Sequence, residues 1–537
     1  MNIEPRCYRP LIIGRRGAVA ANHPLAAQAG LMALRGGGNA IDAAVGTAVT
    51  LAVVEPIMSG LGGDGFYQVF EQASGRAAVF NGSGPAPSAA TQERYARGIP
   101  RVGPLSISVP GMLAGIAAMH QRFGRLPWHD LFTEAITFAR DGFAATPHYC
   151  HLTGEYRATL DLDRRGTATF LVDGDAPPVG APIMQPDLAR TLEEIASEGA
   201  ETFYRGPLAR RLADGLAAAG ALVSAADLAE FAAETQQPIA VDYRGFTVLE
   251  APPNSTGFVL LEELKILEQF DLAAMGLVST DTIHVMVEAK KLAFADRERW
   301  AADPRTVAAP LAKLLSAEYT ARLAANIDMR RAVPTQTVAA ADGDTTYFCT
   351  ADGEGNAVSG VQSINNGYGS GVMAGDTGIL FNNRMAYWHL DPGHPNRLQP
   401  GRRVRHTMNP PIVLKDRALW CVFGTPGADN QVQINMQVLT AMIDFGLDPQ
   451  QAAELPRWTS NLPGQYANWP HDGEEALTIE RRIPEGVCTA LARRGHPVKT
   501  VGDLEGPCSV EIIRRDPTTA MLLAGSDPRR DGWALAW

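Results

Sequence analysis

The sequence predicts a large layered α/β protein in which helices made of small residues pack closely against extended strands. Across residues 18–56, alanines and glycines recur among small apolar residues, and such short side chains let helix backbones approach a sheet. From residue 345 onward, the chain reads mostly as strands and glycine turns. A chain of 537 residues can hold two or more domains or one large layered unit, and both organisations remain open at this point.

The composition is that of an ordinary globular protein and argues against several classes of partner. Hydrophobic residues make up 46% and charged residues 20% of the chain, and the net charge of −11 comes without a long basic tract for nucleic acid. The six cysteines form no CxxC pair, so neither a zinc ribbon nor a disulfide framework is predicted. Because the sequence shows no signal-peptide core and no run of about 18 apolar residues, we expect a cytoplasmic protein without a membrane partner.

Start and stop residues mark the individual elements. Pro24 begins a helix that the three glycines after Arg35 end, and Asn39 opens the next helix. Helices are predicted over 24–34, 39–53, 127–143, 187–198, 224–232, 282–296, 433–445 and 485–494. Strands are predicted over 66–70, 246–249, 346–350, 510–514 and 520–523.

Two short motifs that could bind a cofactor or a metal lack the surroundings that such sites need. The glycines at 60–65 have the spacing of a dinucleotide fingerprint, which requires a strand before it and a helix after it, whereas here a strand follows. We therefore interpret these glycines as backbone that lines a cleft. His148 and His151 have no third ligand nearby, so they are interpreted as helix or surface residues.

Thr345 stands at a junction between a loop and a strand. Residues 334–343 are polar and small, which indicates an exposed, flexible linker, and residues 346–350 have the composition of a short strand. If the bond before Thr345 were cut, its hydroxyl would be a nucleophile and its new α-amine, with a pKa of about 7.7–8, the base. The alternative is that Thr345 simply begins a strand, and these residues alone leave both interpretations open.

A series of motifs runs in order along nearly the whole chain. They include NHPLAAQAG (22–30), GGGNAIDAAVGTAV (36–49), GGDGF (62–66), VPGMLAG (109–115), PPNSTGFVLLEELKILEQFD (252–271), DTT (344–346), the segments 377–383 and 424–427, LPRW (455–458) and GSDPR (525–529). This series resembles the γ-glutamyltranspeptidases and their relatives among the N-terminal-nucleophile hydrolases. So many ordered matches are far more specific than any single motif.

The resemblance implies a four-layer αββα sandwich of the N-terminal-nucleophile hydrolase type. Such a protein is made as a precursor that cuts itself, here between Asp344 and Thr345. Fragments 1–344 and 345–537 would remain together as one intertwined heterodimer, and a dimer of these heterodimers is a further option. No cofactor and no metal is implied.

The resemblance also assigns catalytic roles. Thr345 would attack the preceding carbonyl during maturation and later the substrate amide, with Thr346 beside it. Ser363, eighteen residues on, takes the place of a threonine whose hydroxyl supports the nucleophile. Gly427 and Ala428 match the paired backbone N–H donors of the oxyanion hole, and the alanine keeps the N–H of the usual glycine.

The expected substrate pocket departs from the family pattern. Ser83 stands where relatives hold the glutamate α-carboxylate with an arginine. Arg384 and Tyr387 replace a glutamine and the aspartate that holds the α-ammonium, and His406 and Thr407 replace a serine pair. The α-ammonium of a glutamate substrate would have no carboxylate partner in this pocket. Leaving that charge unpaired would cost on the order of kcal/mol of binding free energy rather than tenths of a kcal/mol.

The pocket would instead offer cationic and neutral donors to a small carboxylate. Arginine suits such a group because its planar fork binds both oxygens. The predicted substrate-binding residues are Arg384, Asn365, Tyr387, His406 and Thr407, with Arg403 and Arg405 as further candidates in a cluster that is partly solvated.

Three activities fit this profile, each on a small-molecule amide. The pocket favours an amidohydrolase for carboxylate-bearing amides, similar to the oxamate amidohydrolases that free ammonia from oxamate. A γ-glutamyl hydrolase or transferase with an altered pocket is the second, and a dicarboxylic-acyl amidase of the cephalosporin-acylase kind is the third. A scaffold without catalysis is also considered, and the presence of Thr345, Thr346, Ser363 and Gly427 argues against it.

Overall fold

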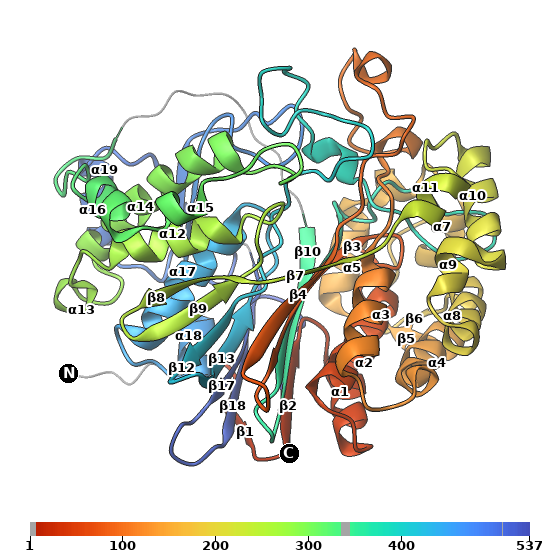
Figure 1. The fold of residues 1–537 in the computed structure, drawn as a ribbon, viewed down its shortest axis with the longest axis horizontal. Coiled ribbons are helices and arrows are strands. Elements are labelled where there is room, and N and C mark those ends of the chain that lie inside the picture. The colour runs from red at the N-terminus through yellow and green to blue at the C-terminus, as the bar shows by residue number, and fades with distance from the viewer. Residues whose placement is uncertain (1–6, 334–343, 507) are drawn as a thin grey trace.

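Two seven-stranded sheets lie face to face at the centre of the molecule, and helices cover their outer faces (Figure 1). This arrangement is seen in a computed structural model that describes residues 7–333, 344–506 and 508–537. The predicted four-layer αββα sandwich is confirmed, and each seven-stranded sheet contains strands from both sides of residue 344. Among the described residues, no helix is both long enough and apolar enough to cross a membrane.

The first sheet interleaves strands from before and after residue 344. Its strands are all antiparallel and run in the order β19 (Trp533–Ala536), β2 (Gly17–Ala21), β10 (Asp344–Asp352), β11 (Ala357–Asn365), β3 (Asp64–Glu71), β4 (Arg76–Gly82) and β7 (Glu234–Gln236). The β10–β11 hairpin therefore pairs with β2 on one side and with β3 on the other. Its backbone hydrogen bonds tie the later part of the chain into the earlier part.

The second sheet is also antiparallel throughout. Its order is β1 (Ile12–Gly14), β18 (Leu522–Ser526), β17 (Glu511–Arg515), β13 (Ala418–Gly424), β12 (Ile412–Lys415), β9 (Phe246–Glu250) and β8 (Ile239–Tyr243). Tyr347 and Val361 of the first sheet meet Ile412 and Val422 of the second in a buried core between the sheets. Phe348, one residue after Tyr347, faces the helices instead, as the two-residue period of a strand requires.

Helices of small residues cover the outer face of the first sheet. The layer contains α1 (Pro24–Arg35), α2 (Ala40–Val54), α3 (Met112–Phe123), α4 (Thr133–Asp141), α5 (Pro147–Glu155), α6 (Arg157–Leu160), α7 (Arg164–Phe170), α8 (Pro186–Glu198), α9 (Glu201–Arg205), α10 (Pro207–Ala219) and α11 (Ala225–Glu230), with the short strands β5 (Phe143–Ala144) and β6 (Pro182–Ile183). All of α2 is buried, and a Cβ on Gly30 of α1 would lie 3.1 Å from the Val19 side chain of β2. The prediction that small residues let helices pack close to a sheet is confirmed.

A second helical layer covers the outer face of the second sheet. It contains α12 (Gly257–Leu267), α13 (Leu272–Met275), α14 (Thr280–Trp300), α15 (Leu311–Leu314), α16 (Ala317–Ala324), α17 (Asn430–Ile443), α18 (Pro449–Glu454) and α19 (Glu485–Arg493). A small sheet of β14 (Trp458–Asn461), β15 (Ala476–Glu480) and β16 (Val498–Val501) lies in the same part of the chain. Residues of α12, α14 and α17 share one buried core with the sheet.

Some elements differ from those predicted. The helix expected over 127–143 is shorter, because a 3₁₀ turn (Trp128–Phe132) precedes α4 and Phe143 already begins β5. The strand β2 was not predicted: its sequence, GAVAA, is buried at all five positions and so lacks the alternation that marks a strand. The linker predicted over 334–343 lies outside the described residues.

Candidate functional site

Thr345 lies at the beginning of β10, buried between its neighbours. Its hydroxyl donates to the Ser363 hydroxyl on β11 over 3.5 Å, and Arg530 donates from Nη1 to the Thr345 carbonyl oxygen over 3.3 Å. The register between β10 and β11 shifts between Asp344 and Thr346, so the ladder is irregular at the predicted cleavage point. Such irregularities are common beside active sites. The Thr346 hydroxyl is buried and finds no hydrogen-bond partner among the described residues.

Asn365 connects the two predicted groups of site residues. It ends β11 with a φ of 82°, and its backbone N–H donates to the Ser363 hydroxyl over 2.7 Å. Its side-chain nitrogen donates to the Asn468 side chain over 2.9 Å, while its side-chain oxygen accepts from Arg384 over 3.4 Å. Asn365 thus holds the hydroxyl beside Thr345 and the guanidinium of the predicted substrate pocket in one network.

Arg384 is a buried cation that keeps one unused donor. It begins the 3₁₀ turn Arg384–Tyr387 and is 1% exposed. Its Nε donates to the Asp64 carboxylate over 3.1 Å, and its guanidinium lies 4.4 Å from the centre of the Tyr387 ring. Its Nη2 is buried without a partner in the described part of the chain. Leaving such a donor unpaired is costly, so this N–H is suited to an acceptor on a ligand.

His406 and Thr407 complete what we call the Arg384 cluster, the six residues Asp64, Asn365, Arg384, Tyr387, His406 and Thr407. His406 Nε2 lies 3.4 Å from the Asp64 carboxylate, and the Tyr387 and Thr407 hydroxyls are 3.2 Å apart. Burial lowers the pKa of His406 to about 4, helped by Arg384 and opposed by Asp64. The imidazole is therefore neutral at neutral pH, donates from Nε2, and keeps an unpaired Nδ1 acceptor within the described structure.

Lowering the pH should reduce the free energy of unfolding, because His406 is protonated more readily in the unfolded chain than in the folded one. Its folded pKa of about 4 lies below the ordinary 6.5, so between these values the unfolded chain binds a proton that the folded one does not. This contribution is complete above pH 6.5 and is lost as the pH falls, reaching a loss of about 2 kcal/mol at pH 5. Urea unfolding at pH 7.5 and pH 5 measures it. Wild type should lose more stability than His406→Gln over this interval, and equal losses would contradict the assignment.

The structure adds Asp64 to the predicted site and corrects the picture of Arg403 and Arg405. Burial raises the pKa of the Asp64 carboxyl, but its bonds to His406 and Arg384 hold the pKa below its ordinary value. In the sequence, the signal that could have identified Asp64 as a site residue was its position directly after a run of glycines. The partial solvation predicted for the arginine cluster is limited to the half-buried Arg402. Arg403 is buried and pairs with Glu234, and Arg405 is buried and pairs with Glu298.

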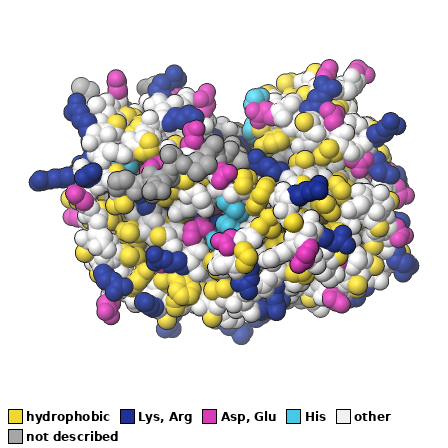
Figure 2. Space-filling view, turned by 90° about the horizontal axis from the view of Figure 1, so that it is seen from above, with side chains coloured by type: hydrophobic (Ala, Val, Ile, Leu, Met, Phe, Trp, Pro, Cys, Tyr) yellow, Lys and Arg dark blue, Asp and Glu magenta, His cyan; other side chains and the backbone are white. Residues whose placement is uncertain are grey.

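Gly427 and Ala428 line a cavity of about 340 Å³ that we call the Lys290 cavity. A Cβ on Gly427 would lie 2.2 Å from the Cys508 sulfur, and its φ is 119°, so both space and backbone require glycine here. Ala428 adopts a φ of 47°, just before helix α17 begins at Asn430. Arg530, which holds the Thr345 carbonyl, lines the same cavity. Figure 2 shows the face seen from above as indented between its two halves.

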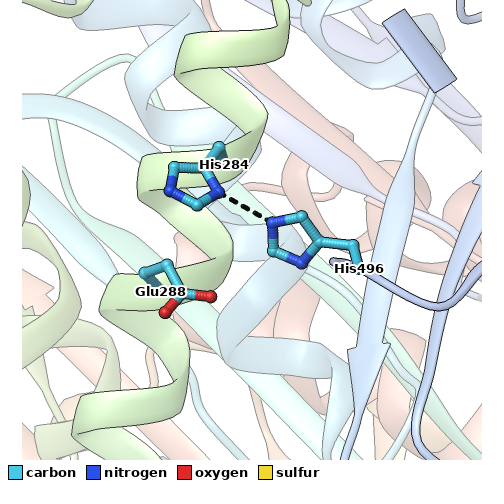
Figure 3. Close-up of side chains that lie close together, drawn as sticks. All are labelled: His284, Glu288 and His496. Atoms are coloured by element: carbon cyan, nitrogen blue, oxygen red, sulfur yellow. Dashed lines mark hydrogen bonds between the residues drawn. The ribbon is translucent and has the colours of Figure 1, made fainter. Parts of the chain in front are cut away.

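Two groups of side chains have the spacing of metal ligands. In the first, His284 and Glu288 of α14 face His496 (Figure 3), and in the second Glu298 lies with His389 and His394. His284 Nδ1 is 2.8 Å from His496 Nε2, and its Nε2 is 2.9 Å from the Asp328 carbonyl oxygen. One tautomer of His284 satisfies both contacts, and Lys291 lies 3.0 Å from the Glu288 carboxylate, so hydrogen bonds and an ion pair account for this group. Neither group includes a residue predicted for catalysis.

The site residues predicted from the sequence fall into two connected places. Thr345, Ser363 and the five predicted substrate residues form one buried network, and Gly427 and Ala428 lie on the Lys290 cavity, which Arg530 joins to Thr345. A hydroxyl, an adjacent hydroxyl and an unpaired guanidinium N–H can together bind and attack a carboxylate-bearing carbonyl compound.

Comparisons with known proteins agree on one family. The gamma-glutamyltranspeptidase family profile matches residues 26–537. The glutathione hydrolase-like YwrD proenzyme of Bacillus subtilis (strain 168) is 37% identical over 527 residues, which cover 98% of this chain and 99% of that protein. The oxamate amidohydrolase proenzyme of Klebsiella pneumoniae is 36% identical over 534 residues, which cover 98% of this chain and 99% of that protein.

A solved structure supports the same assignment. The crystal structure of cephalosporin acylase from Bacillus halodurans matches with a TM-score of 0.90 at 36% identity, and the match covers 100% of this chain and 99% of that one. The match bears out the N-terminal-nucleophile hydrolase fold. The chain therefore belongs to the γ-glutamyltranspeptidase family of hydrolases, which act on amide C–N bonds.

Proposed function

We propose that this protein is a self-processing amidohydrolase with an N-terminal threonine nucleophile, and that it hydrolyses the amide of a small carboxylate-bearing substrate such as oxamate, releasing ammonia. The observation that carries the substrate class is the unpaired Nη2 of Arg384, buried in the network that holds Thr345 and Ser363. A substrate carboxylate would supply the acceptor that this donor lacks.

Maturation would begin at the bond between Asp344 and Thr345. The Thr345 hydroxyl attacks the Asp344 carbonyl carbon, the peptide C–N bond breaks, and the acyl group moves to the hydroxyl oxygen as an ester. Water hydrolyses that ester, which leaves a carboxylate on Asp344 and a free α-amine and hydroxyl on Thr345. Fragments 1–344 and 345–537 stay together because the β10–β11 hairpin remains paired with β2 and β3.

Turnover would repeat the same chemistry on the substrate. The α-amine takes the proton of the Thr345 hydroxyl, the oxygen attacks the amide carbon, and the backbone N–H groups of Gly427 and Ala428 bind the developing oxyanion. Each such donor contributes roughly 2.7–4 kcal/mol to the transition state. Ammonia leaves with a proton returned from the amine, and water then hydrolyses the acyl ester. Thr346 lies beside the nucleophile and completes the predicted catalytic set.

The Arg384 cluster would bind the substrate carboxylate. Asp64 neutralises the charge of Arg384 and fixes its guanidinium, so the pocket presents a positioned N–H donor rather than a loose cation. The hydroxyls of Tyr387 and Thr407 are further donors, and Asn365 aligns the guanidinium with the Ser363 hydroxyl.

Replacing Ser363 with alanine should slow both self-cleavage and turnover about tenfold to hundredfold, because the Thr345 hydroxyl loses the group that orients it. The rate at which two fragments appear on a denaturing gel and kcat for the processed enzyme measure the two effects. Ser363→Thr keeps the hydroxyl and is expected to behave like wild type. Undiminished rates in Ser363→Ala would remove Ser363 from the mechanism.

Two other substrate classes have an observation in their favour. His406 Nδ1 is an unpaired acceptor that a γ-glutamyl ammonium could approach, although both Asp64 oxygens are already engaged. One relative is named a glutathione hydrolase-like proenzyme, and this name favours the γ-glutamyl activity. The solved cephalosporin acylase favours a dicarboxylic-acyl amidase, for which the Lys290 cavity offers space.

One assay separates these activities. Processed wild type is incubated with oxamate, glutathione or glutaryl-7-aminocephalosporanate, with Thr345→Ala as the blank, and ammonia, glutamate or glutarate is measured. Ammonia from oxamate without glutamate supports the proposal. Glutamate without ammonia would replace it with the γ-glutamyl activity, and glutarate alone would replace it with the acylase activity.

A further inference from the structure

Lys290 is a buried lysine on α14 to which the proposed mechanism gives no role. It is 1% exposed, and its Nζ lies 3.8 Å from the centre of the Phe294 ring. Across residues 7–333, 344–506 and 508–537 its ammonium makes no hydrogen bond and no ion pair, although Asp429 and Glu263 are near enough to act on its charge. Lysines are almost never fully buried unless they are paired, because desolvation of the ammonium is expensive. This lysine lines the Lys290 cavity, so the cavity is where a partner can bind.

The carboxylates near Lys290 do not satisfy its charge. Asp429 pairs with Arg297. Burial raises the pKa of Glu263 to about 8, so this carboxyl is protonated and uncharged at neutral pH. Glu505, which also lines the cavity, accepts from the backbone N–H of Gly502 over 2.7 Å. The remaining lining acid, Glu155, is exposed and lies 3.6 Å from the His151 imidazole. Burial and the nearby Arg297 lower the pKa of Lys290 to about 7, so a bound anion would favour the charged form of this lysine.

The rest of the lining is suited to an anion. Arg530 adds a second cation, and Asn430, Asn461 and Asn468 add neutral amide groups. Gly427 and Ala428 belong to the same lining, and Arg530, another member of it, donates to the Thr345 carbonyl oxygen over 3.3 Å. The cavity therefore includes the proposed oxyanion hole.

We infer that Lys290 and Arg530 form a second carboxylate subsite, which binds the amine half of the substrate. This inference rests on the proposed function, in which the Arg384 cluster holds the carboxylate of the acyl half. A substrate that uses both sites is the amide of a small dicarboxylic acid with an amine that itself bears a carboxylate, such as an amino acid. Oxamate, whose leaving group is ammonia, is then the smallest member of the class and leaves most of the 340 Å³ unused.

The chemical step is the same for this larger substrate. The acyl C–N bond breaks as the bond from the acyl carbon to the Thr345 oxygen forms, and the leaving amine takes the proton held by the α-amine. Water then hydrolyses the ester and restores Thr345. Lys290 and Arg530 hold the carboxylate of the leaving amine and take no proton in the reaction.

Two substrates that differ in one terminal group test the subsite by turnover. N-oxalylglycine carries a carboxylate where N-ethyloxamate carries a methyl group, and both share the acyl half of oxamate. In wild type we expect kcat/KM to be about tenfold or more higher for N-oxalylglycine, as charge-assisted hydrogen bonds of about 1.5–3 kcal/mol predict. Lys290→Gln should abolish that preference through KM while leaving oxamate and N-ethyloxamate within about twofold of wild type. Equal loss on all three substrates would mean that Lys290 is structural, and no preference in wild type would overturn the subsite.

Matched variants separate the charge of Lys290 from its position in the fold. Lys291→Gln removes the same charge one residue away. Lys291 pairs with Glu288 and does not line the cavity, so this variant should keep the preference for N-oxalylglycine. Lys290→Arg keeps a cation and should retain part of it. If Lys291→Gln lost the preference as fully as Lys290→Gln, a general electrostatic effect would replace the subsite.

A binding measurement decides the subsite even if oxamate chemistry fails. The Thr345→Ala variant cannot hydrolyse N-oxalylglycine, so calorimetry can measure its binding to that variant. Adding Lys290→Gln to Thr345→Ala should weaken this binding about tenfold. Unchanged or absent binding would overturn the subsite. If N-oxalylglycine bound but wild type hydrolysed no amide, the proposed function would be wrong while the subsite would still be supported.

Discussion

Replacing Thr345 with alanine should leave one full-length chain of 537 residues and abolish amide hydrolysis. Wild type should instead run as two bands on a denaturing gel, with Thr345 at the N-terminus of the smaller fragment by mass spectrometry. The variant lacks the hydroxyl that attacks both the Asp344 carbonyl and the substrate, so the expected loss in kcat is about 10⁴-fold or more. This is the largest effect we expect from any single substitution.

Thr345→Ser is the matched control for this result. It keeps a hydroxyl at the same place, 3.5 Å from Ser363 in the parent chain, and is expected to process and to hydrolyse, although more slowly. Two fragments from Thr345→Ala, or activity in a wild-type chain that stays uncut, would exclude Thr345 as the nucleophile.

Replacing Arg384 with methionine should lower kcat/KM for oxamate about hundredfold and also destabilise the fold. The substrate carboxylate loses the Nη2 donor of Arg384. At the same time Asp64, which is fully buried, loses its cation, and breaking a buried ion pair from one side typically costs about 3–5 kcal/mol. Urea unfolding gives the stability, and kcat/KM for oxamate gives the activity.

A double variant separates the two effects of Arg384. Asp64→Asn combined with Arg384→Met removes both charges, so most of the stability should return while the activity stays low. Arg402→Met, which removes a nearby half-buried arginine outside the Arg384 cluster, should change little. Full activity in the double variant would show that Arg384 supports Asp64 and does not bind substrate.

Elements with local signals were predictable. Asn39 and Asp42 form a capping box at the start of α2, and a pair of residues three positions apart can be recognised in the sequence. The strand β2 has no such signal, because burial on both faces removes the polar half of the alternation. The four-layer order came from the resemblance, since strands as far apart in sequence as β19 and β2 pair only in the folded chain.

The same distinction applies to the site. Ser363 faces Thr345 because one hairpin of β10 and β11 brings positions eighteen residues apart together, and the motif spacing reflects that hairpin. Asp64 and Arg384 are 320 residues apart, and their mutual neutralisation depends on tertiary structure alone. The sequence therefore singled out Arg384 as a candidate for the pocket, while its partner Asp64 and the burial of Arg403 could be seen only in the fold.

The interleaved order of the first sheet has a consequence for how the gene can be divided. If residues 1–344 and 345–537 were encoded as two separate genes, the first polypeptide would lack the hairpin between β2 and β3, and the second would carry that hairpin with both edges unpaired. Unpaired strand edges promote aggregation. Translation as one continuous polypeptide, with the break made only after the sheet has closed, avoids presenting those edges to other chains.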